Sequence, residues 1–133
     1  MSNITFRFKV GPKKVGLRGE QLKYVARPFY ASKMTEDDII ESIVRNYSGT
    51  NSGMVAMVLD AIQREFRNHL FHGHTIRLRN FGTFRLSFNS ASHDSPDDFK
   101  AEDIKNPHIV FTPDISLRRD LKSELTFEEF KQR

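Results

Sequence analysis

Apolar side chains recur at every second position in two segments near the start of the chain. They occupy alternate positions of 4–10 and again of 22–26, and most of the intervening residues are polar or basic. This two-residue period is typical of half-buried strands, and Gly11-Pro12 is expected to end the first one. The two strands predict an N-terminal β-hairpin with three cations at its tip: Lys13, Lys14 and Arg18.

The apolar period then changes to that of helices. Within 39–47 and within 55–70, apolar residues follow one another mostly three or four positions apart, so each set forms a stripe along a helix. Thr35 precedes three acidic residues, a pattern that starts a helix because it caps free N–H groups and complements the helix dipole. Asn51 or Ser52 is expected to cap the second, longer helix.

Two more strands are predicted at 76–78 and 84–88, joined by a turn at 80–83. The apolar residues of both strands fall on alternate positions, so one face of this second hairpin is apolar. Three arginines fall on the opposite face: Arg77, Arg79 and Arg85. A basic face backed by an apolar one is the most distinctive local pattern in the chain.

The rest of the chain contains short elements. Residues 89–103 are polar and acidic and are expected to form a loop, and a strand around 109–111 should stop at Pro113. Helices are predicted at 116–123 and at 126–133, the second because 126–129 has capping-box spacing. Strands and helices are segregated along the chain rather than alternating, which indicates an α+β domain.

Composition and charge indicate one globular domain with an uneven charge distribution. The chain has 133 residues, of which 38% are hydrophobic and 29% charged, within the usual range for a domain. Its net charge is +4, but residues 1–33 hold eight Lys or Arg and one acid, whereas 91–105 hold five acids and two lysines. Segregated positive charge attracts polyanions, nucleic acid first among them. The alternative is that these cations only solvate one face.

Several classes of protein are excluded by what the sequence lacks. There is no cysteine for a disulfide or a thiol nucleophile. The N-terminus lacks a signal pattern and the longest apolar run, Met54–Leu59, is too short to cross a bilayer, so a cytoplasmic protein without a membrane partner is expected. His69, His72 and His74 lack further ligands at metal-binding spacing. No nucleophile lies beside a base, so no enzyme, cofactor or small-molecule substrate is expected.

The segment from Gly73 to Phe84 resembles the HU / integration host factor family of bacterial histone-like DNA-binding proteins. In that family a helix ends at glycine and leads into a strand, a Gly-Phe-Gly-x-Phe turn and a second strand; here Asn80 stands at the first of those glycines. Phe111-Thr112-Pro113 is similar to the closing Phe-x-Pro of the family, which a C-terminal helix follows. The resemblance covers residues 35–123.

The resemblance implies an α+β, HU/IHF-like fold: two N-terminal helices, a three-stranded antiparallel sheet and a C-terminal helix, here with an extra N-terminal β-hairpin. It divides the chain into a basic hairpin extension (1–34), an HU-like DNA-binding domain (35–125) and a short C-terminal helix (126–133). It also implies an intertwined homodimer, because so few elements cannot close a core alone. The expected aromatic core of that dimer is Phe66, Phe81, Phe84, Phe88 and Phe111; the alternative is that these residues fill the core of a monomer.

Two departures from the family affect what can be transferred. The family's long basic arm with an intercalating proline corresponds here to 89–108, which is short and contains five acids and no arginine. Pro96 lies in an acidic setting and Pro107 lies only four residues before Phe111, so intercalation is transferred to neither proline. The N-terminal hairpin is also additional; a branch of HU-like proteins has such an extra segment and a reduced arm.

Two functions are therefore predicted from the sequence. The first is sequence-tolerant binding of double-stranded DNA by a nucleoid-associated architectural protein, through phosphate contacts on the basic strand face. The second is an HU-like dimeric protein-interaction module with little DNA affinity, in which the acidic loop and the hairpin serve a protein partner. The expected DNA-binding residues are Arg77, Arg79, Asn80, Gly82, Thr83, Arg85, Arg118, Arg119, Lys122, Lys13, Lys14 and Arg18.

Overall fold

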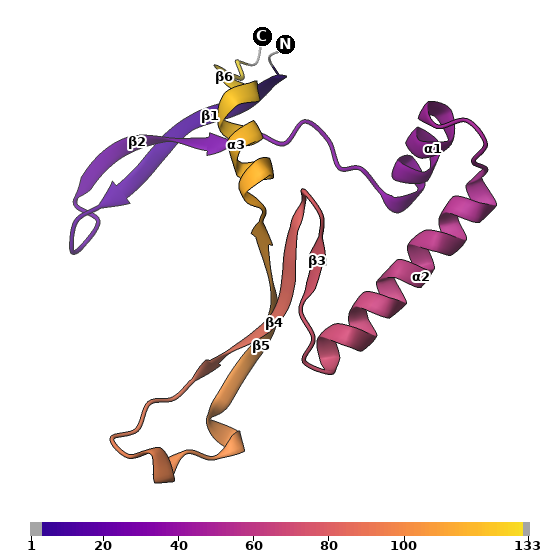
Figure 1. The fold of residues 1–133 in the computed structure, drawn as a ribbon. Coiled ribbons are helices and arrows are strands. Elements are labelled where there is room, and N and C mark those ends of the chain that lie inside the picture. The colour runs from indigo at the N-terminus through magenta and orange to yellow at the C-terminus, as the bar shows by residue number, and fades with distance from the viewer. Residues whose placement is uncertain (1–3, 132–133) are drawn as a thin grey trace. The chain divides into compact units, whose positions relative to one another are not determined.

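The computed structural model describes residues 4–131 and contains three α-helices and two three-stranded sheets within that range (Figure 1). The elements are, in chain order, β1 (Ile4–Val15), β2 (Gln21–Pro28), α1 (Glu36–Asn46), α2 (Ser52–Phe71), β3 (Ile76–Leu78), β4 (Gly82–Ser90), β5 (Ile104–Pro113), α3 (Ile115–Glu124) and β6 (Leu125–Glu129). The chain forms two compact units, Met1–Ile39 with Arg119–Arg133, and Ile40–Arg118. Mixed α and β structure confirms the predicted α+β class.

The first unit contains the predicted hairpin, but its first strand is longer than expected. β1 pairs with β2 in antiparallel register as far as Val15, so the prediction that Gly11-Pro12 ends the strand is wrong. Proline is tolerated there because β6 extends along β1 only as far as Phe8, so beyond Phe8 one side of β1 has no neighbouring strand. Lys13 and Lys14 consequently lie within β1, and the tight turn itself spans 16–19.

The C-terminal segment corrects a second prediction. The helix predicted at 126–133 is wrong as far as the structure describes it, and residues 132–133 lie outside the described range. Leu125–Glu129 form strand β6, which pairs in parallel with the start of β1, from Ile4 opposite Leu125 to Phe8 opposite Glu129. An isolated helix of two turns has little stability of its own, whereas the alternation of Leu125 with Phe127 matches the alternation of β1. The sheet order is β2–β1–β6, so the beginning and end of the chain form one sheet instead of separate segments.

The two helices begin where the sequence predicts. Asp38 closes a capping box with Thr35: its carboxylate accepts from the Thr35 N–H at 2.9 Å, and its own N–H donates to the Thr35 hydroxyl at 3.3 Å. The Asp38 carboxylate also accepts from the Thr35 hydroxyl at 2.9 Å, and the hydrogen bonds that it accepts from the Thr35 N–H and hydroxyl lower the pKa of Asp38. Asn51 caps α2 by accepting from the Met54 N–H at 2.9 Å. Gly73, at φ +88°, follows the end of α2 in the left-handed conformation.

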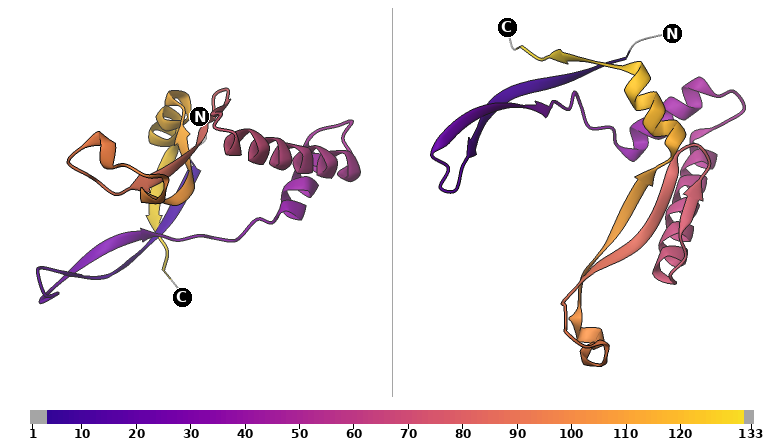
Figure 2. Two further views of the ribbon diagram at one scale, coloured as in Figure 1. Left: turned by 90° about the horizontal axis from the view of Figure 1, so that it is seen from below. Right: turned by 60° about the vertical axis from the view of Figure 1, so that its left-hand side comes forward.

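The second unit contains the sheet β3–β4–β5, in which β4 is the central strand and both pairings are antiparallel. β5 begins at Ile104, well before the predicted 109–111, because β4 offers it a partner as far as Ser90. β4 and β5 therefore continue past β3 as a two-stranded arm (Figure 2). The register shifts between Ser87 and Asn89, opposite a bulge that contains Asn106 at φ +53°.

The turn between β3 and β4 has two positions with strict steric requirements. Asn80 adopts a φ of +62°, the left-handed conformation that suits the glycine of the family motif and that asparagine tolerates. At Gly82 the requirement is space, since a Cβ atom would lie 2.5 Å from Cε1 of Phe111 and 2.5 Å from the carbonyl oxygen of Thr112. The aromatic ring of β5 can pack closely on β4 only because this residue has no side chain.

The apolar interior of the described chain is small. Among residues 4–131, only Ile40, Val55 and Leu70 are buried hydrophobic residues. Four of the five predicted core phenylalanines form a chain of ring contacts, with ring centroids 4.8 to 5.5 Å apart, in the order Phe66, Phe84, Phe111 and Phe81. Phe88 lies further along the arm and is half exposed. In the described part of the chain no helix has the length and apolarity of a membrane span.

We expect Gly82→Ala to destabilise the protein by about 1–3 kcal/mol, the usual cost of inserting a methyl group into a packed site. The Cβ atom would displace Phe111 or the β5 backbone. The control is Gly53→Ala in the first turn of α2, where the nearest atom is 3.5 Å away. That variant should be neutral or slightly stabilising. Thermal unfolding followed by circular dichroism measures both, and equal melting temperatures for the two variants would contradict the prediction.

Candidate nucleic-acid interface

The strand register gives the sheet β3–β4–β5 one polar and one apolar face. Arg77 lies opposite Thr83, and Thr83 lies opposite Thr112, so these three side chains share a face. Arg85 is two positions after Thr83 on β4 and belongs to the same face. Phe84 and its neighbours occupy the reverse face. The prediction that Arg77 and Arg85 lie opposite the apolar side chains is confirmed by this register, whereas Arg79 lies in the turn.

One of these arginines is held by an ion pair that the sequence pattern did not suggest. Arg77 Nη2 lies 3.0 Å from Oδ2 of Asp114, and its Nε donates to Oδ1 at 3.4 Å. The hydrogen bonds and charge of Asp114 raise the pKa of Arg77, and the same hydrogen bonds lower the pKa of Asp114. The Asp114 carboxylate also accepts from the backbone of Asn80, and its N–H donates to the Phe81 carbonyl. Asp114 therefore ties the β3–β4 turn to the start of α3.

The sequence contained a signal for this role. Asp114 directly precedes α3, where an aspartate is a favourable helix cap, and the Arg118 N–H donates to its carbonyl at 3.0 Å. The residue stands immediately after the Phe-x-Pro segment, but only the folded chain brings it to Arg77. The charge of Arg77 is thus partly neutralised within the molecule.

Arg85 on the polar face and Arg79 in the adjoining turn are the two arginines here that have no acidic partner within residues 4–131. Both are exposed. Arg85 donates from Nη1 to the Thr112 hydroxyl at 2.9 Å, which holds its guanidinium across the polar face. The site therefore presents two exposed guanidinium groups without an acidic partner in the described range, one on the sheet and one in the turn, while Arg77 is paired with Asp114.

The three cations of α3 are exposed but belong to different units. Arg118 lies in the unit that contains the strand face, whereas Arg119 and Lys122 lie in the unit of the N-terminal sheet. At the hairpin, Lys13 is opposite Lys23 and Lys14 is opposite Leu22, so Lys13 and Lys14 lie on opposite faces of β1. The three cations predicted at the hairpin tip do lie at or beside the turn, but Lys13 and Lys14 do not share a face.

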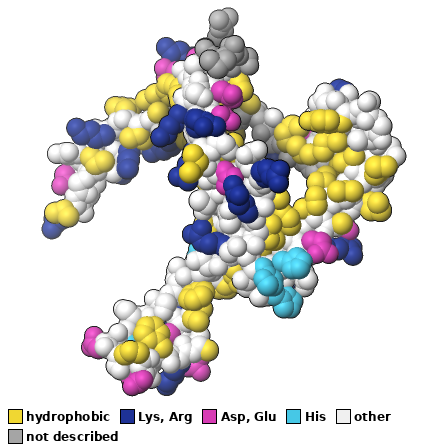
Figure 3. Space-filling model, in the orientation of Figure 1, with side chains coloured by type: hydrophobic (Ala, Val, Ile, Leu, Met, Phe, Trp, Pro, Cys, Tyr) yellow, Lys and Arg dark blue, Asp and Glu magenta, His cyan; other side chains and the backbone are white. Residues whose placement is uncertain are grey.

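The end of the arm is an organised acidic cap instead of an open loop. Two 3-10 turns span Pro96–Asp98 and Ala101–Asp103. Asp103 accepts from His93 Nε2 at 3.0 Å and from the Lys100 N–H at 2.8 Å, and the His93 ring packs against Phe99. Acidic side chains surround exposed apolar ones at this end of the molecule (Figure 3). Pro96 is the first residue of a 3-10 turn and is surrounded by acids.

A metal site is not formed by the described residues: no cluster of three potential His, Asp or Glu ligands occurs within 4–131. The ring centroids of His69 and His74 lie 5.8 Å apart, and His69 Nε2 lies 3.0 Å from Oε2 of Glu65. His72 instead donates from Nδ1 to the Asn68 carbonyl at 2.7 Å. The contacts of these three histidines thus lie at and just beyond the C-terminal end of α2.

A helix pair, an antiparallel sheet whose central and last strands extend into an arm, and a helix after Phe-x-Pro define an HU-like fold. A family model described as an HU domain fused to a wHTH, Ig or glycine-rich motif matches residues 2–129, and the chain belongs to this family. No match is found among curated proteins.

Two solved structures show the same fold. A proposed bacterial DNA-binding protein from Bacteroides vulgatus ATCC 8482 superposes with a TM-score of 0.68 at 11% identity, over 100% of this chain and 50% of its own length. This chain thus spans half the length of that protein. An Anabaena HU–DNA cocrystal structure gives a TM-score of 0.52 at 14% identity, over 68% of this chain and 99% of the HU chain.

We expect Asp114→Asn to reduce the acid sensitivity of the protein. A carboxyl whose pKa is lowered below its ordinary 3.8 contributes stability above that value, and loses the contribution as the pH falls through its folded pKa. The melting temperature of Asp114→Asn should therefore lie below that of the unmodified protein at pH 7, and the gap should narrow below about pH 4. Asp94→Asn is the control. A gap independent of pH would contradict the role of the Arg77–Asp114 pair.

Proposed function

We propose that this protein is a sequence-tolerant, DNA-binding architectural protein of the nucleoid, acting as a homodimer and not as an enzyme. The observation that carries the proposal is the two-sided sheet, with exposed Arg85 on the polar face, exposed Arg79 in the adjoining β3–β4 turn, and the phenylalanine cluster on the reverse face. Membership of an HU family and likeness to an HU structure solved with DNA support it.

The mechanism is neutralisation of phosphates without base readout. Guanidinium groups suit phosphate because they donate in a planar fork, and a sheet face with short threonine side chains lets a duplex approach. Backbone N–H groups around Asn80, Gly82 and Thr83 are further candidate donors to phosphate. We also propose that the exposed cations of α3 contact phosphates; they are Arg118, Arg119 and Lys122. Contacts of this kind fix a protein on DNA but carry little sequence information, hence sequence tolerance.

The acidic arm end limits what this binding does to the duplex. In the described residues, 91–103 holds five acids and one lysine, and phosphates would be repelled from it. The protein therefore binds without inserting either proline between base pairs, and we expect weaker bending than intercalating architectural proteins produce. Already deformed DNA would be preferred because it requires less bending energy.

The homodimer is proposed from the uncovered apolar surface of the second unit. The stripe of α2 contains Val58 and Ile62, which are 48% and 43% exposed although the pattern requires a buried stripe. On the sheet, Phe81 and Phe111 are 47% and 38% exposed. Apolar patches of this kind are found where a second chain packs. A second copy supplies the same stripe and the same aromatic face, so a two-fold dimer covers both.

A second candidate function is a dimeric interaction module with little DNA affinity. The specific observation in its favour is the arm end, where Phe99 is 50% and Ile104 48% exposed within an acidic surround. Exposed apolar side chains ringed by charge are a common anchor for a protein partner. A partner of this cap would be basic. DNA binding by the strand face remains the first proposal because the two exposed arginines have no internal partner acids among the described residues.

We expect Arg79→Gln with Arg85→Gln to weaken binding to duplex DNA and to lower the steepness of its salt dependence. Each lost phosphate contact reduces the log–log slope by about 0.9, so two contacts reduce it by about 1.8. The measurement is fluorescence anisotropy of a labelled 20-base-pair duplex at several salt concentrations. Arg77 is left intact because its substitution would also break the ion pair with Asp114, and a loss of stability could then be mistaken for a loss of binding.

The matched control for this experiment is Arg45→Gln with Arg64→Gln, which removes the same charge from helices α1 and α2. It should retain the slope of the unmodified protein. If the unmodified protein shows no salt-dependent binding, the DNA-binding proposal fails and the interaction module becomes the better explanation. If the control and the Arg79/Arg85 variant behave alike, the strand face is not the binding surface.

We expect Ile62→Lys to abolish the dimer, because the ammonium group would be placed in the apolar contact between two α2 stripes. Sedimentation velocity measures this, and the melting temperature of the unmodified protein should rise with protein concentration. Met57→Lys is the matched control, since Met57 lies two residues from Val55 and hence on the opposite side of the helix. An Ile62→Lys variant that sediments like the unmodified protein would contradict the proposed dimer contact.

A further inference from the structure

The N-terminal hairpin has its own basic face, separate from the strand face of the other unit. Register places alternate residues of β1 and β2 on one side, and every charged residue that these two strands contribute there is a cation. All are exposed, and they are Arg7, Lys9, Lys13, Lys23 and Arg27. In the described part of this sheet, the acid on the same side is Glu128 of β6, opposite Arg7. Figure 3 shows basic side chains along this hairpin.

The arrangement of these cations is unfavourable for the hairpin itself. Lys9 is directly opposite Arg27, and Lys13 is directly opposite Lys23. Like charges in directly opposed positions of an antiparallel pair destabilise the sheet. Two such pairs in one eight-residue strand pairing break a local rule of sheet design, and sequences break such rules mostly where a function requires it. An anionic ligand lying on this face would remove the repulsion.

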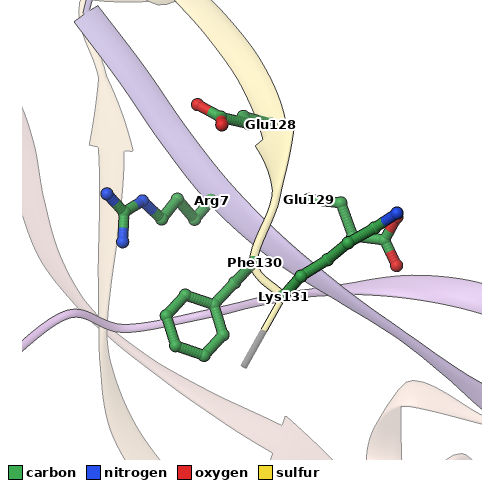
Figure 4. Close-up of a pocket in the computed structure, with 5 residues that line it drawn as sticks. All are labelled: Arg7, Glu128, Glu129, Phe130 and Lys131. Carbon is green, nitrogen blue, oxygen red and sulfur yellow. The ribbon is translucent and has the colours of Figure 1, made fainter. Parts of the chain in front are cut away.

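Aromatic and backbone contacts hold several of these cations in place. The rings of Phe29 and Phe130 stack at 4.0 Å, and Lys9 Nζ lies 5.0 and 5.2 Å from their centroids. Figure 4 shows the Arg7 and Phe130 side chains on the same side of the strands, and the Arg7 guanidinium lies 5.8 Å from that ring. Arg27 donates to the Pro12 carbonyl at 3.2 Å.

The Arg27 guanidinium crosses the face at Gly11, where a Cβ atom would lie 3.0 Å from Nη1. The absence of a side chain at Gly11 therefore lets a long cation lie flat on the sheet. Together with the aromatic contacts of Lys9 and Arg7, this holds the cationic side chains close to the sheet. The face is therefore preorganised for a ligand. Preorganised cations lose less conformational entropy when a ligand binds.

We propose that this face is a second DNA-binding surface, which contacts the phosphate backbone of duplex DNA independently of Arg79 and Arg85. The cations between Arg7 and Lys13 extend along a strand for about 20 Å at roughly 3.4 Å per residue. A linear array of this length fits an extended polyanion and exceeds the size of a single phosphate group. Beyond Phe8 the hairpin is a two-stranded ribbon, an element that the major groove of DNA can accommodate between its phosphates.

The test compares two variants that remove the same charge from the same hairpin. Lys13→Gln with Lys23→Gln removes one opposed pair from the face, whereas Lys14→Gln with Arg18→Gln removes one cation from the reverse face and one from the turn. Anisotropy of the labelled duplex is measured across a range of salt concentrations. The face variant should bind more weakly, with a slope lower by about 1.8, and should melt at the same or a higher temperature because the repulsion is gone.

The second readout separates folding from binding, because a damaged hairpin would melt at a lower temperature. The proposal is overturned if the face variant binds like the unmodified protein, or if the Lys14/Arg18 variant accounts for the loss. It is also overturned if the loss appears with a labelled single strand and not with the duplex. The Arg79/Arg85 variant is measured beside these: if it loses affinity while the face variant does not, this inference fails and the proposed function of the strand face stands.

Discussion

Pairing of β4 with both of its neighbours is the interaction on which the second unit depends. Because β4 is central, its alternation fixes the side on which every arginine and phenylalanine of the sheet lies. Gly82 allows Phe111 to pack on β4, and Asp114 then joins the end of β5 to Arg77 and to the turn. A slip of one residue would turn the phenylalanines toward the polar side and the guanidinium groups toward the apolar side.

The same pairing explains why this unit does not bury its own apolar surface. The unit has one three-stranded sheet and one long helix, and each has an apolar face. A stable domain must cover such faces with another layer of secondary structure. The ring contacts from Phe66 to Phe81 begin a core, yet the outer rings stay partly exposed. The constraint that places Arg77 and Arg85 on one face thus also leaves the opposite, apolar face partly exposed. The proposed DNA binding and the proposed dimer therefore both rest on this one alternation.

In the N-terminal sheet, strand alternation also sorts the side chains onto two faces, and one of these faces carries most of the cations. Its parallel β1–β6 pairing joins the two ends of the chain, which gives the hairpin a third strand and thereby more stability than an isolated two-stranded hairpin has. That support allows β1 and β2 to carry two directly opposed like-charge pairs. In this sheet, the side chains that disfavour strand pairing locally are those with the clearest chemistry for a polyanion.

Much of this was determined by the sequence itself. The positions of α1, α2 and α3 follow from capping residues and period, and the opposition of Arg77 and Arg85 to the phenylalanines follows from a two-residue alternation, because both signals are local. The turn around Gly82, with Asn80 in place of the first glycine of the motif, and the Phe-x-Pro segment were sufficient to predict the family.

Only the tertiary structure decided the features that need residues distant in the chain. The segment 126–129 has the spacing of a helix start but becomes a strand because β1 provides a matching edge. β1 continues through Gly11-Pro12 because its other neighbour ends at the level of Phe8, and Lys13 and Lys14 separate to opposite faces as a result. The Arg77–Asp114 pair joins residues 37 positions apart. Local patterns determine the period of an element. The partner with which it pairs determines its length, which of its charges stay unpaired and, in a short segment, whether it becomes a helix or a strand.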